Sequence, residues 1–374
     1  MTTARRVVAT LLFAAIASPT LAVTAVWIGP ETGDWTDPTN WSTGQVPIVY
    51  QTAIIDNDES RHSQVFVSDP LWGVGSLTID YLDTLILENF SAEEVHLAGE
   101  FVVLEDGRFD LRNNLDIEET GHLEINGIFS SLYKSSSTGN SIWNRGSIDG
   151  AGVLELSDSL RNDGTLSVNG EGKHLSVTLG NKTEGSYIVG TNGGLIQATS
   201  GGSLLLSRTF ASIGARLLNY QDSTPGRIEA LAGSSLTIRS LIIEGGVVSS
   251  EVQDDSHGNL LIEQSQLDGV QLEGEIDLKY VTLTGAVQNL GQLNLTYNCG
   301  LLGTLSGGGV VQFAHSSITY NTGYGRDATF VNEDNVLRGQ GTFESGNMVN
   351  RGTIETGFGT EEPVQLSDYK GLVD

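Results

Sequence analysis

Three tryptophans near the N-terminus, Trp27, Trp35 and Trp41, have the clearest capacity for chemistry in this chain. Flat indole faces can stack on the apolar faces of sugar rings, so the cluster is a candidate glycan-stacking site. The same rings can instead pack against one another and bury a large apolar area. The residues between them are rich in Pro, Asn, Thr and Asp, which favour tight turns. We therefore favour a packed cap, with glycan stacking as the alternative.

The other reactive side chains define no catalytic or metal site by their spacing. The six histidines occur singly, without the paired spacing of zinc ligands. The segment Asp56–Glu59 has oxygen ligands that suit calcium, but it lacks the glycine and the distant glutamate of an EF-hand loop, so we interpret it as a polar turn. Cys299 has no histidine beside it to lower its pKa, which favours a buried small side chain. We expect no catalytic residue and no cofactor, with a calcium ion among the carboxylates as the alternative.

The N-terminus predicts export. Arg5 and Arg6 precede an apolar run from Val7 to Ala17 and small residues at Thr20 and Ala22, the pattern of a secretory signal peptide over residues 1–22. Cleavage after Ala25 fits equally well. The apolar run is too short to cross a bilayer as a helix, so we expect no transmembrane segment in the mature chain and an extracellular or cell-surface location. With one cysteine, the exported chain can form no intramolecular disulfide.

The charge of the chain limits its partners. The 374 residues carry a formal net charge of −27, and removal of residues 1–22 deletes two arginines and no acid, which gives −29. Such a field repels nucleic acid and anionic membranes and keeps a repetitive protein soluble. We expect no nucleic-acid partner; surface glycans or other cell-surface proteins remain as candidates.

Apolar residues alternate with polar ones in short runs from about Ser76 onward, which predicts strands rather than helices. The runs repeat: residues 196–206 align without gaps on residues 228–238, 32 positions later. A second pattern, Asn-x-Gly followed by an apolar residue two positions on, starts at four asparagines, Asn144, Asn162, Asn289 and Asn350. The first two are 18 residues apart, enough for one coil of three short strands.

These repeats predict an all-β fold, a right-handed parallel β-helix or β-solenoid with an N-terminal cap. Stacked coils share one core, and asparagines at one coil position would form a ladder that satisfies inward backbone groups. Glycines between the strands would supply the positive φ of sharp turns. We divide the chain into the signal peptide, a Trp-rich cap over residues 23–75 and solenoid repeats over residues 76–374.

Several motifs carry a resemblance to a known group. Trp27-Ile-Gly, Gly33-Asp-Trp35 and Asn40-Trp41-Ser resemble the opening segment of bacterial exported repeat proteins, which include autotransporter-like passengers and proteins with a PEP-CTERM sorting signal. Later segments such as residues 226–238, 332–341 and 349–354 strengthen it. The resemblance implies a β-helical passenger at the cell surface with an adhesive or matrix-building role. Such proteins usually end in an attachment module, whereas residues 365–374 show none, so the chain is either truncated or released.

Two functions follow from these observations. The first is an exported structural or adhesin-like solenoid that presents an acidic polar surface and catalyses nothing. The alternative is a β-helical protein that binds or degrades a polysaccharide, because carboxylates on adjacent coils can meet in space. A cleft with two carboxylates and aromatic walls would favour the enzyme.

Overall fold

The computed structural model describes eleven ranges of the chain: 23–55, 62–68, 73–131, 141–157, 159–180, 188–208, 215–253, 256–319, 329–344, 347–356 and 365–367. The signal peptide predicted over residues 1–22, the turn Asp56–Glu59 and Trp72 lie outside these ranges.

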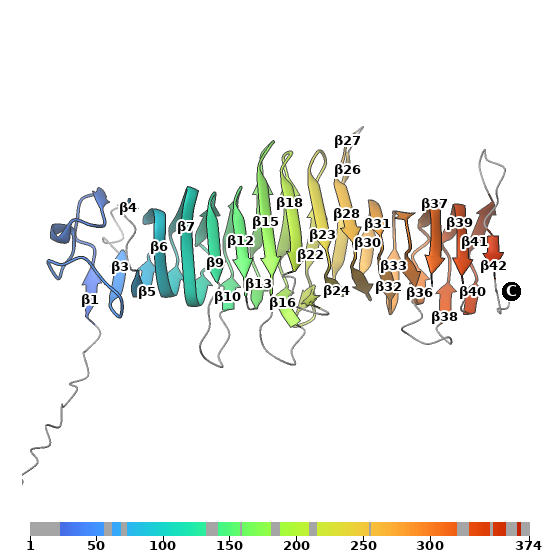
Figure 1. The fold of residues 1–374 in the computed structure, drawn as a ribbon, viewed down its shortest axis with the longest axis horizontal. Helices are drawn as coiled ribbons and strands as arrows, with labels where there is room; N and C mark the ends of the chain where they lie inside the picture. Colours follow the sequence, from blue (N-terminus) through green and yellow to red (C-terminus); the bar gives the residue numbers. More distant parts are fainter. Residues whose placement is uncertain are drawn as a thin grey trace, which may run out of the picture.

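Within them the chain winds into coils of three strands, and the coils stack into a rod with the first strands at one end and the last at the other (Figure 1). Strands at equivalent positions of successive coils pair in parallel and form three columns, which we call A, B and C in chain order. Column A contains β1 (Thr24–Val26), β3 (Thr52–Ile55), β5 (Val74–Ile79), β10 (Ser141–Asn144), β13 (Leu160–Asn162), β16 (Ile188–Asn192), β19 (Arg216–Leu218), β24 (Ile242–Glu244), β29 (Gln266–Asp268), β32 (Thr282–Thr284) and β35 (Gly300–Leu301).

Column B contains β2 (Thr32–Asp34), β4 (Gln64–Val67), β8 (His122–Ile125), β11 (Ser147–Gly150), β14 (Thr165–Asn169), β17 (Leu195–Thr199), β22 (Arg227–Ala230), β25 (Val247–Ser250), β30 (Gln271–Glu273), β33 (Ala286–Asn289), β36 (Gly303–Ser306), β38 (Thr329–Asn332) and β40 (Asn347–Asn350).

Column C contains β9 (Ile128–Ser131), β12 (Val153–Leu156), β15 (His174–Leu179), β18 (Ser203–Arg208), β23 (Ser235–Arg239), β28 (Asn259–Glu263), β31 (Glu275–Lys279), β34 (Gln292–Thr296), β37 (Val310–Thr319), β39 (Val336–Glu344), β41 (Thr353–Thr356) and β42 (Gln365–Ser367). Two long strands, β6 (Thr84–Leu97) and β7 (Glu100–Ile117), bend through all three columns. Two hairpins, β20 (Tyr220–Gln221) with β21 (Thr224–Pro225) and β26 (Val252–Gln253) with β27 (Ser256–His257), are antiparallel insertions between coils' strands.

The parallel β-solenoid is therefore confirmed, and so is the gapless internal repeat. Ile196 pairs with Ile228, and Leu204 pairs with Leu236, so the two copies are adjacent coils stacked in register. The 18-residue step from Asn144 to Asn162 is likewise one turn of the solenoid.

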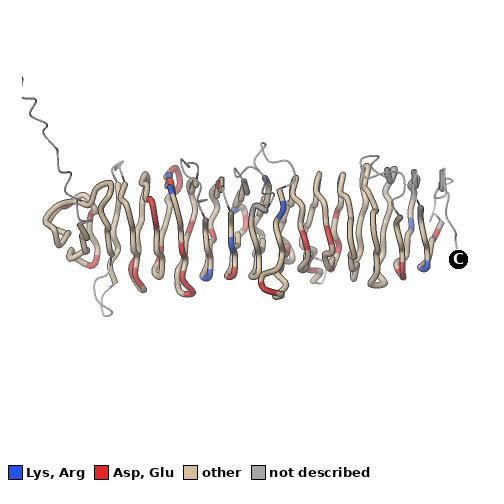
Figure 2. The backbone as a smooth tube through the Cα atoms, turned by 90° about the horizontal axis from the view of Figure 1, so that it is seen from below, with Lys and Arg blue, Asp and Glu red and all other residues tan. Residues whose placement is uncertain are grey.

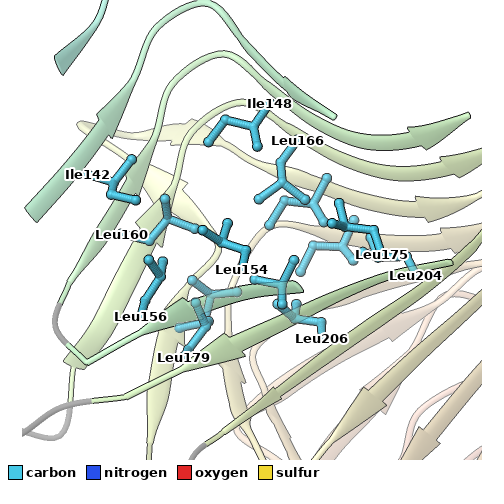
Figure 3. Close-up of a cluster of buried hydrophobic side chains, with 14 of the residues drawn as sticks. Ile142, Ile148, Leu154, Leu156, Leu160, Leu166, Leu175, Leu179, Leu204 and Leu206 are labelled. Atoms are coloured by element: carbon cyan, nitrogen blue, oxygen red, sulfur yellow. The ribbon is translucent and has the colours of Figure 1, made fainter. Parts of the chain in front are cut away.

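Alternate side chains of each strand fill one continuous core between the three columns. Strand β12 buries Leu154 and Leu156 and turns the residue between them outward. Figure 3 shows the core of these middle coils, where leucines and isoleucines from all three columns meet. Full burial of one such side chain is worth about 1.5–3 kcal/mol, so each coil is held mainly by its neighbours.

The predicted asparagine ladder is present. Nδ2 of Asn144 donates to Oδ1 of Asn162 over 2.7 Å, and Asn162 donates to Asn192 in the same way over 2.7 Å. Asn192 continues the row to Asn219, again over 2.7 Å. Each amide also donates to a backbone carbonyl at the start of a column B strand, as Asn162 does to Leu195. The ladder thus satisfies backbone acceptors that the bend leaves without a sheet partner.

One part of the ladder prediction is wrong, because the Asn-x-Gly motifs do not share one coil position. Asn144 and Asn162 end column A strands, whereas Asn289 and Asn350 end column B strands. These last two belong to a second row: Asn289 donates to Asn335 over 3.0 Å, and Asn332 donates to Asn350 over 2.7 Å. The motif serves any bend between two strands, so its residue pattern is the same at both corners.

The glycine of the motif also has a different role from the one expected. A Cβ on Gly164 would lie 2.2 Å from the carbonyl oxygen of Gly146 in the preceding coil, and its φ is not positive. Close approach of two coils, and not a left-handed backbone, therefore requires glycine there.

Candidate functional site

The three tryptophans are buried in the N-terminal end of the rod. Trp27, Trp35 and Trp41 are 1%, 0% and 1% exposed. Trp41 meets Trp27 and Trp35 edge to face, with ring centroids 5.3 and 4.6 Å apart, and its Nε1 donates to the Trp35 carbonyl over 2.9 Å. The ring of Trp35 also packs against that of Phe90, with the ring centroids 5.0 Å apart. Because all three rings are buried, they leave no indole face for a sugar.

The chain around these tryptophans also covers the outer edge of β1. The turn that includes η1 (Pro38–Asn40) returns so that the amide of Ile28 donates to the carbonyl of Asn40 and that of Ser42 donates to Val26, both over 2.8 Å. The bridge between Trp27 and Trp41 is antiparallel. The C-terminal end of β1 is therefore bonded on both sides, which shortens the open edge that could recruit another chain.

Trp143 lies at the rim of the rod. It is 37% exposed, and the guanidinium groups of Arg145 and Arg161 lie 4.5 and 4.6 Å from its ring centroid. Asp116 pairs with Arg145, and Asp163 pairs with Arg161 and accepts from the indole. The cluster is an ion-paired surface network.

The reactive side chains remain dispersed in the part of the chain that the structure describes, where no group of three or more His, Cys, Asp or Glu residues is placed to hold a metal ion. Cys299 is buried, and burial raises the pKa of its thiol. Residues Glu275 and Asp277 of β31 both accept from Nδ2 of Asn294, over 2.8 and 3.0 Å, and line a depression of about 250 Å³ with His257.

A different group of residues lines a larger surface groove, at the corner where column C passes into column A. Four successive coils each contribute one residue there, which directly follows the last residue of a column C strand. These residues are Ser240, Gln264, Tyr280 and Tyr297. All four have positive φ, 60°, 51°, 56° and 62°. Arg208 is the first residue of the same row. Its neighbour Ser207 pairs with Arg239, so Arg208 has the position in its coil that Ser240 has in the next one. We call these five residues the corner row.

Beside the corner row lies a groove, which we call the corner groove. It has a volume of about 700 Å³ and is open to solvent. Its floor is formed by Leu241 and by the first outward residues of three column A strands, Ile242, Gln266 and Thr282. The remaining lining residues are Arg208, Ser240, Gln264, Ser265 and Tyr280. The groove therefore combines amide, hydroxyl and guanidinium groups with a small apolar floor and one aromatic wall.

That wall is a pair of tyrosines. The rings of Tyr280 and Tyr297 are stacked, with centroids 5.2 Å apart and planes inclined by 22°, and they are 44% and 55% exposed. Tyr297 lies one coil further along the rod, so it covers one face of Tyr280. Gln264 lies one coil before Tyr280, and both residues line the corner groove. The Nζ of Lys279 lies 5.0 Å from the Tyr297 ring centroid.

The bulk of these tyrosines is unusual for their backbone. A left-handed conformation costs about 1–2 kcal/mol for a residue with a Cβ, and glycine or asparagine normally occupies it. Tyrosine at two successive coils therefore carries strain, which points to a role for the side chains.

Charges near the corner groove are largely paired with one another. Arg239 pairs with Glu263 of the next coil, and Arg216 pairs with Glu244. Of the residues that line the groove among those described, Arg208 alone is charged, and none is an aspartate or glutamate. The groove can donate and accept hydrogen bonds and can stack on a flat ligand, but it offers no carboxylate for acid–base chemistry.

None of the groove residues was selected from the sequence. Tyr280 and Tyr297 are 17 positions apart, and each directly follows a strand in which apolar and polar residues alternate. Tyrosine, and not glycine or asparagine, occupies the positive-φ position at both bends. A scan against protein-family models finds no match to this chain, and a search of curated proteins finds none either.

Proposed function

We propose that this chain is an exported, adhesin-like β-solenoid that holds a partner surface through the exposed rows of its coils and catalyses no reaction. The corner groove carries this proposal: it is a built, open surface site with hydrogen-bonding groups and an aromatic wall, and its lining holds no carboxylate among the described residues.

The architecture supports the adhesive role. Each coil is fixed by its neighbours, so outward side chains repeat at a spacing of about 4.8 Å and form straight rows along the rod. A row of this kind binds by repetition of weak contacts and needs no moving part. Among the residues that the structure describes, no helix is long and apolar enough to span a membrane.

Export and membership of the group that includes autotransporter-like passengers and PEP-CTERM proteins belong to the same proposal. They are supported by the signal-like segment of residues 1–22 and by the Trp-rich motifs, together with the solenoid architecture. Figure 2 shows acidic residues along the length of the rod and fewer, isolated basic ones, which fits partners other than nucleic acid or an anionic membrane.

One observation favours the enzymatic alternative. Glu275 and Asp277 share a single amide donor, so their carboxyl groups lie close enough to act as a pair. Against this, Asn294 already donates to Oε1 of Glu275 and Oδ1 of Asp277. The rest of the depression beside them is lined by His257, Gly258, Asn259 and Leu260, without an aromatic wall.

The test uses the full chain expressed in a bacterial host. We expect the processed protein outside the cytoplasm, beginning at residue 23 or 26 by mass spectrometry, and beads coated with it to adhere to cells or matrix polysaccharide. Soluble polysaccharides incubated with it should release no shorter product. Retention of residues 1–22 in the cytoplasm, failure to adhere to every surface, or product release that Glu275→Gln abolishes would contradict the proposal.

A further inference from the structure

The corner groove has the chemistry of a sugar site. Its aromatic wall, Tyr280, is 44% exposed, and the half-buried Ile242 contributes apolar atoms to the lining above the buried Leu241. Around them stand the amides of Gln264 and Gln266 and the hydroxyls of Ser240 and Thr282. A pyranose ring has the complementary arrangement, an apolar C–H face surrounded by hydroxyl groups that both donate and accept.

The dimensions of the corner groove suit a short oligosaccharide. From Arg208 to Tyr280 the corner row takes three coil steps, which is about 14 Å because neighbouring strands of a sheet are about 4.8 Å apart. One coil step is therefore about as long as one sugar unit, so each coil places one set of hydrogen-bonding groups beside one unit. A chain laid along the row meets a different side chain of the corner row at every unit and ends against the Tyr280 ring.

A peptide is a poorer fit, because the backbone at this corner has no free edge. The amide of Gln264 donates to the Lys279 carbonyl over 3.0 Å, and the amide of Gln266 donates to Leu241 over 2.9 Å. These ladder bonds leave no strand edge to which an extended peptide could add. A ligand at this corner would contact side chains, among which Gln266 already donates to Thr284 over 3.0 Å.

The charge of the site favours a neutral ligand. Arg208 is the single charged residue in the lining, and the nearby Arg239 is already paired with Glu263. The net charge of −27 on the chain opposes the approach of an acidic sugar.

We infer that the corner groove binds a short neutral oligosaccharide, with one pyranose ring stacked on Tyr280 and its neighbours hydrogen-bonded by Gln264, Gln266 and Ser240. This inference rests on the proposed adhesive function and names the ligand class of its site. Tyr297 supports Tyr280 from behind and holds its ring at the end of the groove.

The experiment titrates the purified full-length exported chain with neutral tetrasaccharides of glucose, mannose and N-acetylglucosamine and with tetragalacturonate as the acidic counterpart. Calorimetry is expected to detect saturable binding of at least one neutral tetrasaccharide. Tyr280→Ala should weaken that binding at least tenfold, which corresponds to a loss of about 1.4 kcal/mol. Tyr280→Phe should stay within about threefold, because the ring face is retained.

Tyr81→Ala, which removes an exposed tyrosine from an N-terminal coil, is the matched control and should leave the affinity unchanged. Binding of tetragalacturonate alone, neutral binding that survives Tyr280→Ala, or no neutral binding by a folded wild-type chain would overturn the inference. If coated beads still adhere to cells in those cases, the adhesive function stands without this ligand; if the beads do not adhere, the proposed function itself fails.

Discussion

Nδ2 of Asn162 donates to Oδ1 of Asn192 over 2.7 Å, although the two residues are 30 positions apart in the chain. The same Nδ2 donates to the carbonyl of Leu195, and Oδ1 of Asn162 accepts from Asn144. All three asparagines are fully buried. One side chain thus ties three coils together at the corner between columns A and B, and the stacking of the rod depends on such links.

Asn162→Ala removes these bonds and leaves Oδ1 of Asn192 and the carbonyl of Leu195 without these donors, while the Asn144 amide keeps only its bond to the carbonyl of Thr165. Each buried unsatisfied group costs about 1–3 kcal/mol, so we expect a loss of at least about 2 kcal/mol in the free energy of unfolding by urea titration. Asn169→Ala, at an exposed position of the same coil, is the control and should stay within about 0.5 kcal/mol of wild type. Equal stability of the two variants would show that the ladder is dispensable.

Trp41→Ala should weaken the N-terminal end of the rod by about 3–5 kcal/mol, because a fully buried aromatic ring is lost from the cluster with Trp27 and Trp35. Hydrogen exchange should accelerate first in β1 and β3. Since the cap also covers the edge of β1, light scattering should detect concentration-dependent association of the variant. Trp143→Ala, at the rim, should cause a smaller loss and no association; association of both variants or neither would contradict this role of the cap.

His122 gives the rod a dependence on pH. Its Nε2 lies 3.2 Å from Oδ1 of Asp149 and its Nδ1 lies 3.5 Å from Oε1 of Glu100. The Asp149 carboxylate foremost, with Glu100 and Glu124, raises the pKa of His122 above its ordinary value of 6.5. Protonated His122 therefore stabilises the fold: the contribution is complete below pH 6.5 and is lost as the pH rises through the raised folded-state pKa.

We expect the melting temperature of the wild type to fall across that window relative to His122→Gln, which cannot titrate. Thermal melts of both chains at half-unit steps of pH provide the measurement. Parallel profiles for the two chains would show that His122 is not linked to folding.

Tyr280→Asn separates stability from binding. Asparagine adopts positive φ more readily than tyrosine, so relief of backbone strain opposes the loss of the ring contact with Tyr297. We expect a melting temperature within about 3 °C of wild type or higher, together with loss of oligosaccharide binding. A large fall in the melting temperature would instead identify Tyr280 as a packing residue.

The strands and the stacking of the solenoid were predictable because local alternation and repetition determine them. The aligned segments at Ile196 and Ile228 became adjacent coils, since a repeat that buries the same face must stack on itself. The asparagine ladder was predictable in kind, but its two corners were not, because Asn-x-Gly suits any bend with a close approach between coils. Asn219 was missed because the hairpin β20–β21 separates it from Gly226, the glycine of its own bend.

The corner groove was not predictable for a different physical reason. Its wall depends on Tyr280 and Tyr297 at positive φ, where sequence patterns lead one to expect glycine or asparagine, and on a register that places residues of four coils side by side. The tryptophans, in contrast, stand out in the sequence by residue type, yet all three rings are buried and meet edge to face.

The most direct test of the central claim is one calorimetric titration of the wild-type chain and Tyr280→Ala with the same neutral tetrasaccharide, followed by mass spectrometry of the recovered sugar. The account predicts saturable binding by the wild type, at least tenfold weaker binding by the variant, and a tetrasaccharide recovered intact. Cleaved sugar, or equal affinity of the two chains, would contradict it.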